Sequence, residues 1–162
     1  MLRYIFFVLI AVLVVFIMIR DRKTVAANAE VQINAPQDRV WRILTGISEW
    51  KNWKGDIESM QVDGDIGVGT IFVWKAGGIS IESEITEYEP ERRIVWKGKT
   101  FGIDAIHTWR FSETEQGTRV YTEEEFTGLL AWLLPGTMRN QIKKALTQGV
   151  NALKQASESV SS

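Results

Sequence analysis

The chain has 162 residues, of which 24% are charged, and a formal net charge of −1. This near-neutral balance lacks the basic excess of nucleic-acid-binding proteins, so nucleic acid is not an expected partner. The chain has no cysteine and a single histidine, which leaves too few of the usual nitrogen and sulfur ligands for a zinc site. We therefore expect no metal and no cofactor, and one domain large enough for a hydrophobic core.

An uncharged apolar run, residues 4–19, stands near the start of the sequence, with Arg3 before it and a basic flank at 20–23 after it. At about 1.5 Å per residue, a helix over residues 2–19 nearly spans a hydrocarbon core about 30 Å thick. We predict a single-pass membrane helix that contacts the lipid bilayer through residues 2–19. The basic flank places the following domain in the cytoplasm.

Two alternatives to this anchor stay open. The first is a cleaved signal peptide, because Ala27-Asn28-Ala29 fits a small-residue cleavage pattern. Against it, the basic residues at 20–23 lie between the apolar run and that site, which disfavours translocation. The second is a helix that lies along the membrane surface.

The sequence divides into four segments by composition. Residues 1–23 form the anchor and its flank, and residues 24–28 a linker. Residues 29–157 carry the periodic apolar patterns of a folded domain, and residues 158–162 form a serine-rich tail that we expect to be frayed.

The domain begins with one strand and two short helices. Residues 29–33 alternate between apolar and polar side chains, as a half-buried strand does. Pro36 suits the first turn of a helix whose apolar stripe runs to Leu44. A second short helix carries Trp50 and Trp53.

Six further segments alternate or are rich in β-branched and aromatic residues, with turn residues between them: 57–62, 70–75, 79–88, 92–97, 103–111 and 118–127. Apolar residues at helical spacing then predict a helix from about Pro135 to about Ser157. This helix is the only element large enough to cover the apolar face of the sheet. We predict an α+β fold, with a curved antiparallel β-sheet wrapped around a long C-terminal helix and preceded by one transmembrane helix.

Three motifs carry a resemblance to a known family. They are the opening VQINAP with the following Val40-Trp41, the WKNW of residues 50–53, and the ITEYEPERRIVW of residues 85–96. Over residues 29–156 the sequence resembles the START-like helix-grip superfamily, and within it the polyketide cyclase/dehydrase and lipid-transport subgroup (SRPBCC-type). The resemblance implies a cavity between sheet and long helix that holds apolar or amphipathic ligands. Members include cyclases, lipid carriers, quinone-binding proteins and hormone receptors.

Aromatic side chains make large, rigid walls for such a cavity, although each could equally be ordinary core. The residues that we expect to bind the ligand are Trp41, Trp53, Trp74, Trp96, His107, Trp109, Phe126, Met138 and Ile142.

Two titratable residues are candidates for catalysis. His107 lies mid-strand in phase with Trp109, so it faces inward as a general base, as a hydrogen-bonding group for the ligand, or as a hydrogen-bonded core residue. Glu124 shares a strand face with Thr122 and Phe126. If that face is the cavity, desolvation raises the pKa of Glu124 and makes it an acid or base; if it is an open edge, the carboxylate is solvated.

The predicted function is membrane-anchored binding of a small hydrophobic or lipid-like ligand in this cavity. One alternative is a cyclase or dehydratase type of enzyme, which requires the side chains of His107 and Glu124 to converge. Another is a protein-interaction module at the membrane, which requires an exposed apolar patch and no internal cavity.

Overall fold

The computed structural model describes residues 3–7, 9–10, 14, 24–100 and 102–159. From residue 24 onward the helical elements are α2 (Gln37–Thr45), the 3-10 turn η1 (Ile47–Glu49), α3 (Trp50–Trp53), α4 (Leu129–Leu133) and α5 (Pro135–Glu158). The strands are β1 (Val25–Ile33), β2 (Ile57–Val62), β3 (Ile71–Ala76), β4 (Ile79–Glu89), β5 (Arg93–Thr100), β6 (Ile103–Thr114) and β7 (Gly117–Thr127).

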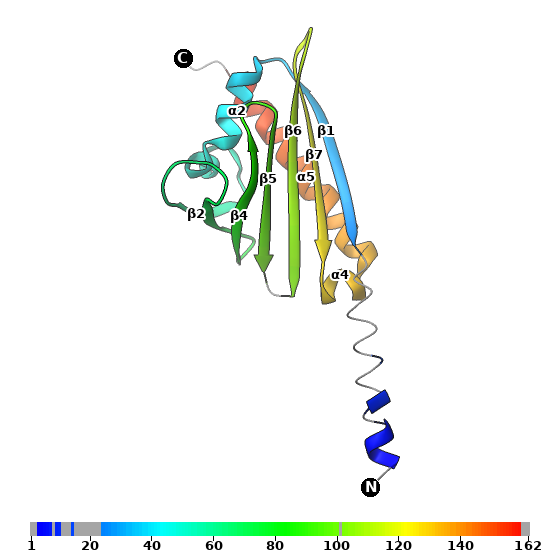
Figure 1. Cartoon of the computed structure of the whole chain (residues 1–162). Helices are drawn as coiled ribbons and strands as arrows, with labels where there is room; N and C mark the ends of the chain where they lie inside the picture. Colours follow the sequence, from blue (N-terminus) through cyan, green and yellow to red (C-terminus); the bar gives the residue numbers. More distant parts are fainter. Residues whose placement is uncertain (1–2, 8, 11–13, 15–23, 101, 160–162) are drawn as a thin grey trace.

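The strands form one antiparallel sheet in the order β1-β7-β6-β5-β4-β3-β2. Strands β2 to β7 follow one another as neighbours, and β1 crosses over to pair with the last strand, from Val25↔Phe126 to Ile33↔Thr118. Figure 1 shows the sheet in front and α5 crossing behind it. The predicted α+β architecture, a curved antiparallel sheet with a long C-terminal helix, is confirmed for the described residues.

Helix α5 is amphipathic and lies mainly along β1. Its buried side chains Ile142, Leu146, Val150 and Leu153 recur at helical spacing and face the sheet. Each of the four is at most 2% exposed, so burial of this stripe is a large part of what holds the helix on the sheet. Because the helix favours the β1 side, the inner faces of β3, β5 and β6 are less closely covered by it.

Strand β1 begins four residues earlier than the alternation in the sequence indicates. The expected linker was residues 24–28, and all of it from Val25 onward belongs to β1. Within this stretch Ala27 pairs with Glu124. After Val25, the residues Ala26, Ala27 and Asn28 have little intrinsic strand preference. Their strand conformation follows instead from the hydrogen bonds that β7 supplies.

A short helix, α4, stands between the last strand and α5. Gly128 precedes it with a φ of 118°, and a Cβ atom there would clash with the Gly102 carbonyl. Glycine therefore lets the end of β7 approach the β5–β6 turn closely. Figure 1 shows α4 at that end of the sheet.

The predicted membrane helix requires a correction. No helix among the described residues is long and apolar enough to cross a membrane. Within residues 2–19 only 3–7, 9–10 and 14 are described, as helix, and the rest of this predicted anchor lies outside the described residues. A span needs about 20 consecutive apolar residues, so the prediction of a single-pass membrane location with a cytoplasmic domain is not upheld by the structure.

Candidate ligand-binding site

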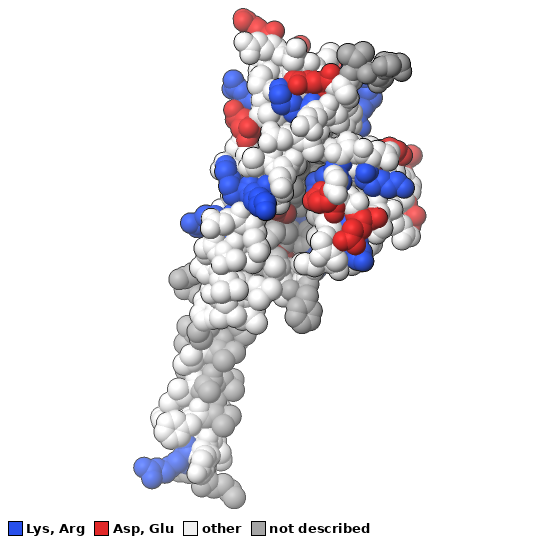
Figure 2. All heavy atoms as spheres, turned by 180° about the vertical axis from the view of Figure 1, so that it is seen from behind, with Lys and Arg blue, Asp and Glu red and all other residues white. Residues whose placement is uncertain are grey.

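A cavity of about 230 Å³ lies between the inner face of the sheet and α5. Strands β3 to β7 supply one wall, and Ala145, Leu146 and Gly149 of α5 supply the other. Most of the lining is apolar. Seen from the α5 side, the surface of the molecule is hollowed near its middle, with charged side chains beside the hollow (Figure 2).

The strand register brings the polar centre of this cavity together. Trp96 of β5, His107 of β6 and Glu124 of β7 are direct cross-strand neighbours in one row. Along β6, alternation puts Ala105, His107 and Trp109 on the same inner face. The imidazole of His107 lies 4.8 Å from the Trp96 ring and stacks on Trp109 with an interplanar angle of 27°.

Aromatic rings close one end of the cavity. The Trp50 ring lies 5.6 Å from that of Trp96 and 5.8 Å from that of Phe72. The Trp50 indole Nε1 donates a hydrogen bond of 2.7 Å to the Leu44 carbonyl, which fixes the ring. A recess of about 30 Å³ reaches between Trp50 and Trp53, so α3 acts as an end wall.

His107 and Glu124 face each other inside the cavity with their side chains only 13% and 14% exposed, and Nδ1 lies 3.5 Å from Oε1. Burial lowers the pKa of His107 to about 3, with a smaller contribution from the positive charge of Lys54. Burial also raises the pKa of Glu124 to about 7, which Lys54 partly opposes. Although the distance is within ion-pair range, the imidazole is neutral at pH 7, so this contact is not a salt bridge.

The hydrogen bonds of His107 assign its tautomer. The Thr122 hydroxyl donates its one proton to the Thr108 carbonyl at 3.1 Å. With the hydroxyl oriented in this way, the 2.8 Å contact between His107 Nε2 and Thr122 Oγ1 is a bond donated by Nε2–H. The neutral ring therefore turns an unprotonated Nδ1, an acceptor, toward Glu124.

A charged pair marks the rim of the cavity. Lys54 Nζ donates to both carboxylate oxygens of Asp56, at 2.9 and 2.8 Å, and lies 5.5 Å from the centre of the Trp74 ring. The Trp74 indole N–H donates to Ser83 Oγ at 3.1 Å. The Asp56 side chain is 55% exposed and that of Lys54 only 19%, so the lining changes here from charged to apolar.

Six of the residues singled out from the sequence line this cavity: Trp74, Trp96, His107, Trp109, Glu124 and Phe126. Trp53 lines the recess. Trp41, Met138 and Ile142 lie elsewhere. The Trp41 ring packs 5.3 Å from those of Tyr88 and Phe111, and Met138 and Ile142 belong to the packing of α5 on the core.

Sequence reasoning missed further lining residues, among them Lys54, Asp56, Ser83, Gly98 and Gly149. Strand alternation places Gly98 in phase with Trp96, and Gly149 lies on the apolar face of the last helix, so both had a signal. Small residues on a buried face make room, as at Gly149, where a Cβ would lie 3.9 Å from Trp109 Cη2. No sequence pattern indicated that Lys54 and Asp56 line the cavity, because their position depends on how α3 packs against β2.

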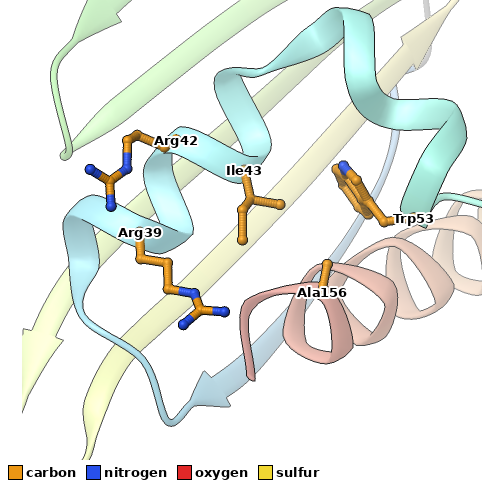
Figure 3. Close-up of a pocket in the computed structure, with 5 residues that line it drawn as sticks. All are labelled: Arg39, Arg42, Ile43, Trp53 and Ala156. Atoms are coloured by element: carbon orange, nitrogen blue, oxygen red, sulfur yellow. The ribbon is translucent and has the colours of Figure 1, made fainter. Parts of the chain in front are cut away.

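A second hollow, of about 520 Å³, is larger but open to solvent. Figure 3 shows Arg39 and Arg42 projecting from α2 and Trp53 from α3, across from Ala156 of α5. Arg39 donates to the Ser159 carbonyl, and Arg42 pairs with Asp38 at 3.1 Å. Both arginines thus have partners within the chain, and we take the enclosed cavity as the candidate site.

The family model described as polyketide cyclase / dehydrase and lipid transport matches residues 24–158. The chain belongs to this family. No curated protein matches the sequence. The family match extends from β1 to α5 and therefore includes every residue that lines the cavity.

Solved structures show the same helix-grip fold. A hypothetical protein from Helicobacter pylori has a TM-score of 0.72 and 19% identity, covering 84% of this chain and 88% of that one. The di-domain ARO/CYC StfQ from the steffimycin biosynthetic pathway has a TM-score of 0.70 and 16% identity, covering 86% and 52%. Ara h 8.0201 has a TM-score of 0.68 and 14% identity, covering 83% and 97%. These likenesses establish the fold.

The raised pKa of Glu124 predicts a loss of stability as the pH rises. The carboxyl ionises near its ordinary pKa of 4.5 in the unfolded chain but keeps its proton to about pH 7 in the folded one. Stability therefore falls from about pH 4.5 to pH 7, and the full cost applies above pH 7. We expect Glu124→Gln to gain about 3 kcal/mol relative to wild type between pH 5 and pH 8.5, measured by urea unfolding.

The matched control is Glu125→Gln, which removes a carboxylate from the opposite face of the same strand. His107, whose pKa is lowered to about 3, contributes the opposite slope only below pH 6.5, so the fall in wild-type stability above pH 6.5 belongs to Glu124. A stability difference between Glu124→Gln and wild type that stays constant with pH would show that Glu124 is not buried as described.

Proposed function

We propose that this domain binds a compact, largely apolar small molecule in the cavity between the sheet and α5. The observation that carries the proposal is a cavity with aromatic walls in which, among the described residues, the side chains of His107 and Glu124 converge while only 13% and 14% exposed. Pockets for small molecules combine such apolar walls with a few placed polar groups. Membership of a family described by cyclase, dehydrase and lipid-transport activities supports the proposal.

The small residues that line the cavity also favour a binding role. A core selected only for stability would fill this space with larger side chains, yet α5 and β5 present Gly149 and Gly98 to it.

The volume limits the ligand. Pockets for drug-sized molecules span about 300–1,000 Å³, and this cavity is smaller. The site therefore suits a compact ring system better than a long acyl chain. The cavity volume therefore restricts the predicted ligand class, hydrophobic or lipid-like molecules, to its compact members.

A second candidate function is acid–base catalysis of the cyclase or dehydratase type. The observation in its favour is that the side chains of His107 and Glu124 do converge, at 3.5 Å, inside an apolar cavity. The neutral imidazole can take a proton from carbon at Nδ1 while the protonated carboxyl of Glu124 gives its proton to the carbonyl oxygen, so a ketone becomes an enol. The carboxylate that Glu124 becomes lies 3.5 Å from the new imidazolium and stabilises it, which offsets the low pKa of His107.

A third reading, a protein-interaction module, has less support. Leu129, Leu133 and Leu134 around α4 are half or more exposed and would be its surface. That reading calls for an apolar patch without an internal cavity, and the described residues enclose one.

Filling the cavity from α5 tests the binding proposal. We expect Gly149→Ala to weaken the binding of naphthalene about tenfold, because its methyl group occupies ligand space and overpacking costs about 1–3 kcal/mol. The same change favours the helix by up to about 1 kcal/mol, so the variant should remain folded and reach a higher Tm. Isothermal titration calorimetry and thermal unfolding measure the two effects.

Gly136→Ala is the matched control, since it makes the same change in α5 with nothing within 4 Å of the new methyl group. It should leave naphthalene binding unchanged. Equal binding by wild type and Gly149→Ala, or no binding by wild type, would contradict the proposed site.

The catalytic candidate has its own test. If the pair performs acid–base chemistry, wild-type protein should accelerate exchange of the α-hydrogens of 2-tetralone with D₂O, followed by proton NMR. Glu124→Gln and His107→Gln should each lose most of this acceleration, on the order of 100-fold, because each removes one of the two proton-transfer groups. Exchange no faster than in buffer would rule out this role for such ketones.

A further inference from the structure

We infer that the polar end of the ligand is an uncharged hydroxyl group, of an alcohol or a phenol, that donates its hydrogen bond to Nδ1 of His107. Thr122 is the positioning residue for this contact, because its hydroxyl fixes which nitrogen of the imidazole carries the proton. The inference rests on the proposed binding function and names the chemical class of ligand for that site.

Burial holds the Thr122 side chain in place. Its side chain is fully buried, and its hydroxyl lies between two groups of β6, the Thr108 carbonyl at 3.1 Å and His107 Nε2 at 2.8 Å. A hydroxyl has one proton to donate, and either the carbonyl or an unprotonated Nε2 can accept it. With that proton on the Thr108 carbonyl, the imidazole donates from Nε2, and the lone pair of the neutral ring is left on Nδ1.

The geometry on the other side of the ring leaves a place for a third oxygen. His107 Nδ1 and Glu124 Oε1 are 3.5 Å apart, which is longer than the 2.7–3.2 Å of a good hydrogen bond. Among the described residues, neither the Nδ1 atom nor the Glu124 carboxyl has a hydrogen bond to another group. A hydroxyl can donate to Nδ1 and accept from the protonated carboxyl, so one neutral group serves both.

A carboxylate ligand fits this arrangement poorly. It offers only acceptors, so it cannot bond to an Nδ1 lone pair, and it would bring negative charge beside Glu124. Lys54 is the nearest cation, and its ammonium already bonds to both oxygens of Asp56 at the rim. A hydrocarbon without a polar group leaves both Nδ1 and the carboxyl without a partner.

Three probes with the same ring system separate these cases: naphthalene, 2-naphthol and 2-naphthoate. Binding to the full-length chain is measured by isothermal titration calorimetry at pH 6, where the hydroxyl of 2-naphthol is neutral. We expect 2-naphthol to bind at least tenfold more tightly than naphthalene, and 2-naphthoate more weakly than 2-naphthol. Binding of 2-naphthol no tighter than naphthalene would overturn this inference and leave the proposed function standing. If naphthalene does not bind either, the proposed function fails too.

The role of Thr122 is tested by Thr122→Val, which keeps the shape and removes the hydroxyl. The tenfold preference for 2-naphthol over naphthalene should then shrink to about twofold or less, while naphthalene binds as before. Thr122→Ser should restore the preference. Thr108→Val is the control, because it removes a neighbouring hydroxyl from the outer face and leaves the Thr108 carbonyl in place.

Nitrogen-15 NMR of the imidazole decides the tautomer in the wild-type protein and does not depend on any variant folding. We expect the proton on Nε2 of His107 near pH 7, and a changed tautomer population in Thr122→Val. A proton on Nδ1 in the wild type, or an unchanged 2-naphthol preference in Thr122→Val, would overturn the assigned role of Thr122.

Discussion

The placement of α5 along β1 is the constraint on which the rest of this structure depends. A helix about 10 Å wide cannot cover a seven-stranded sheet, and the buried stripe from Ile142 to Leu153 holds it to one side. Toward the β2 side of the sheet, the Trp50 ring packs on those of Phe72, Trp74 and Trp96, with Trp53 beside it. Between these two covers the small residue Gly149 leaves the cavity open.

Desolvation then sets the chemistry inside that cavity. His107 and Glu124 each stay uncharged over a wider pH range than they would in water, because burial removes the hydration of the charged form. A buried ion pair does not form, and His107 and Glu124 remain as a neutral acceptor and a carboxyl that holds its proton to about pH 7. Such a site discriminates between ligands by their hydrogen-bonding groups and not by their charge.

The fold was largely predictable from the sequence, because alternation along the strands and the helical stripe of α5 are local patterns that tertiary contacts reinforce. The inward faces of His107 and Glu124 followed from the same alternation. Positions that depend on packing between distant segments were not predictable. Trp41 looked like a cavity wall but packs against Tyr88 and Phe111, and Lys54 reaches the rim only because α3 folds over the sheet. The predicted membrane span relied on the length of the apolar run and on its flanking charges, which are both local features of the sequence.

The measurement that tests the central claim most directly is where a bound apolar probe lies. Nuclear Overhauser effects between naphthalene protons and the protein locate the probe without any substitution. The structure predicts contacts to the rings of Trp96, Trp109 and Phe126, which line the cavity on three neighbouring strands. Contacts only to the exposed leucines Leu129, Leu133 and Leu134, or no contacts to the inner face of the sheet, would contradict a ligand-binding cavity between the sheet and α5.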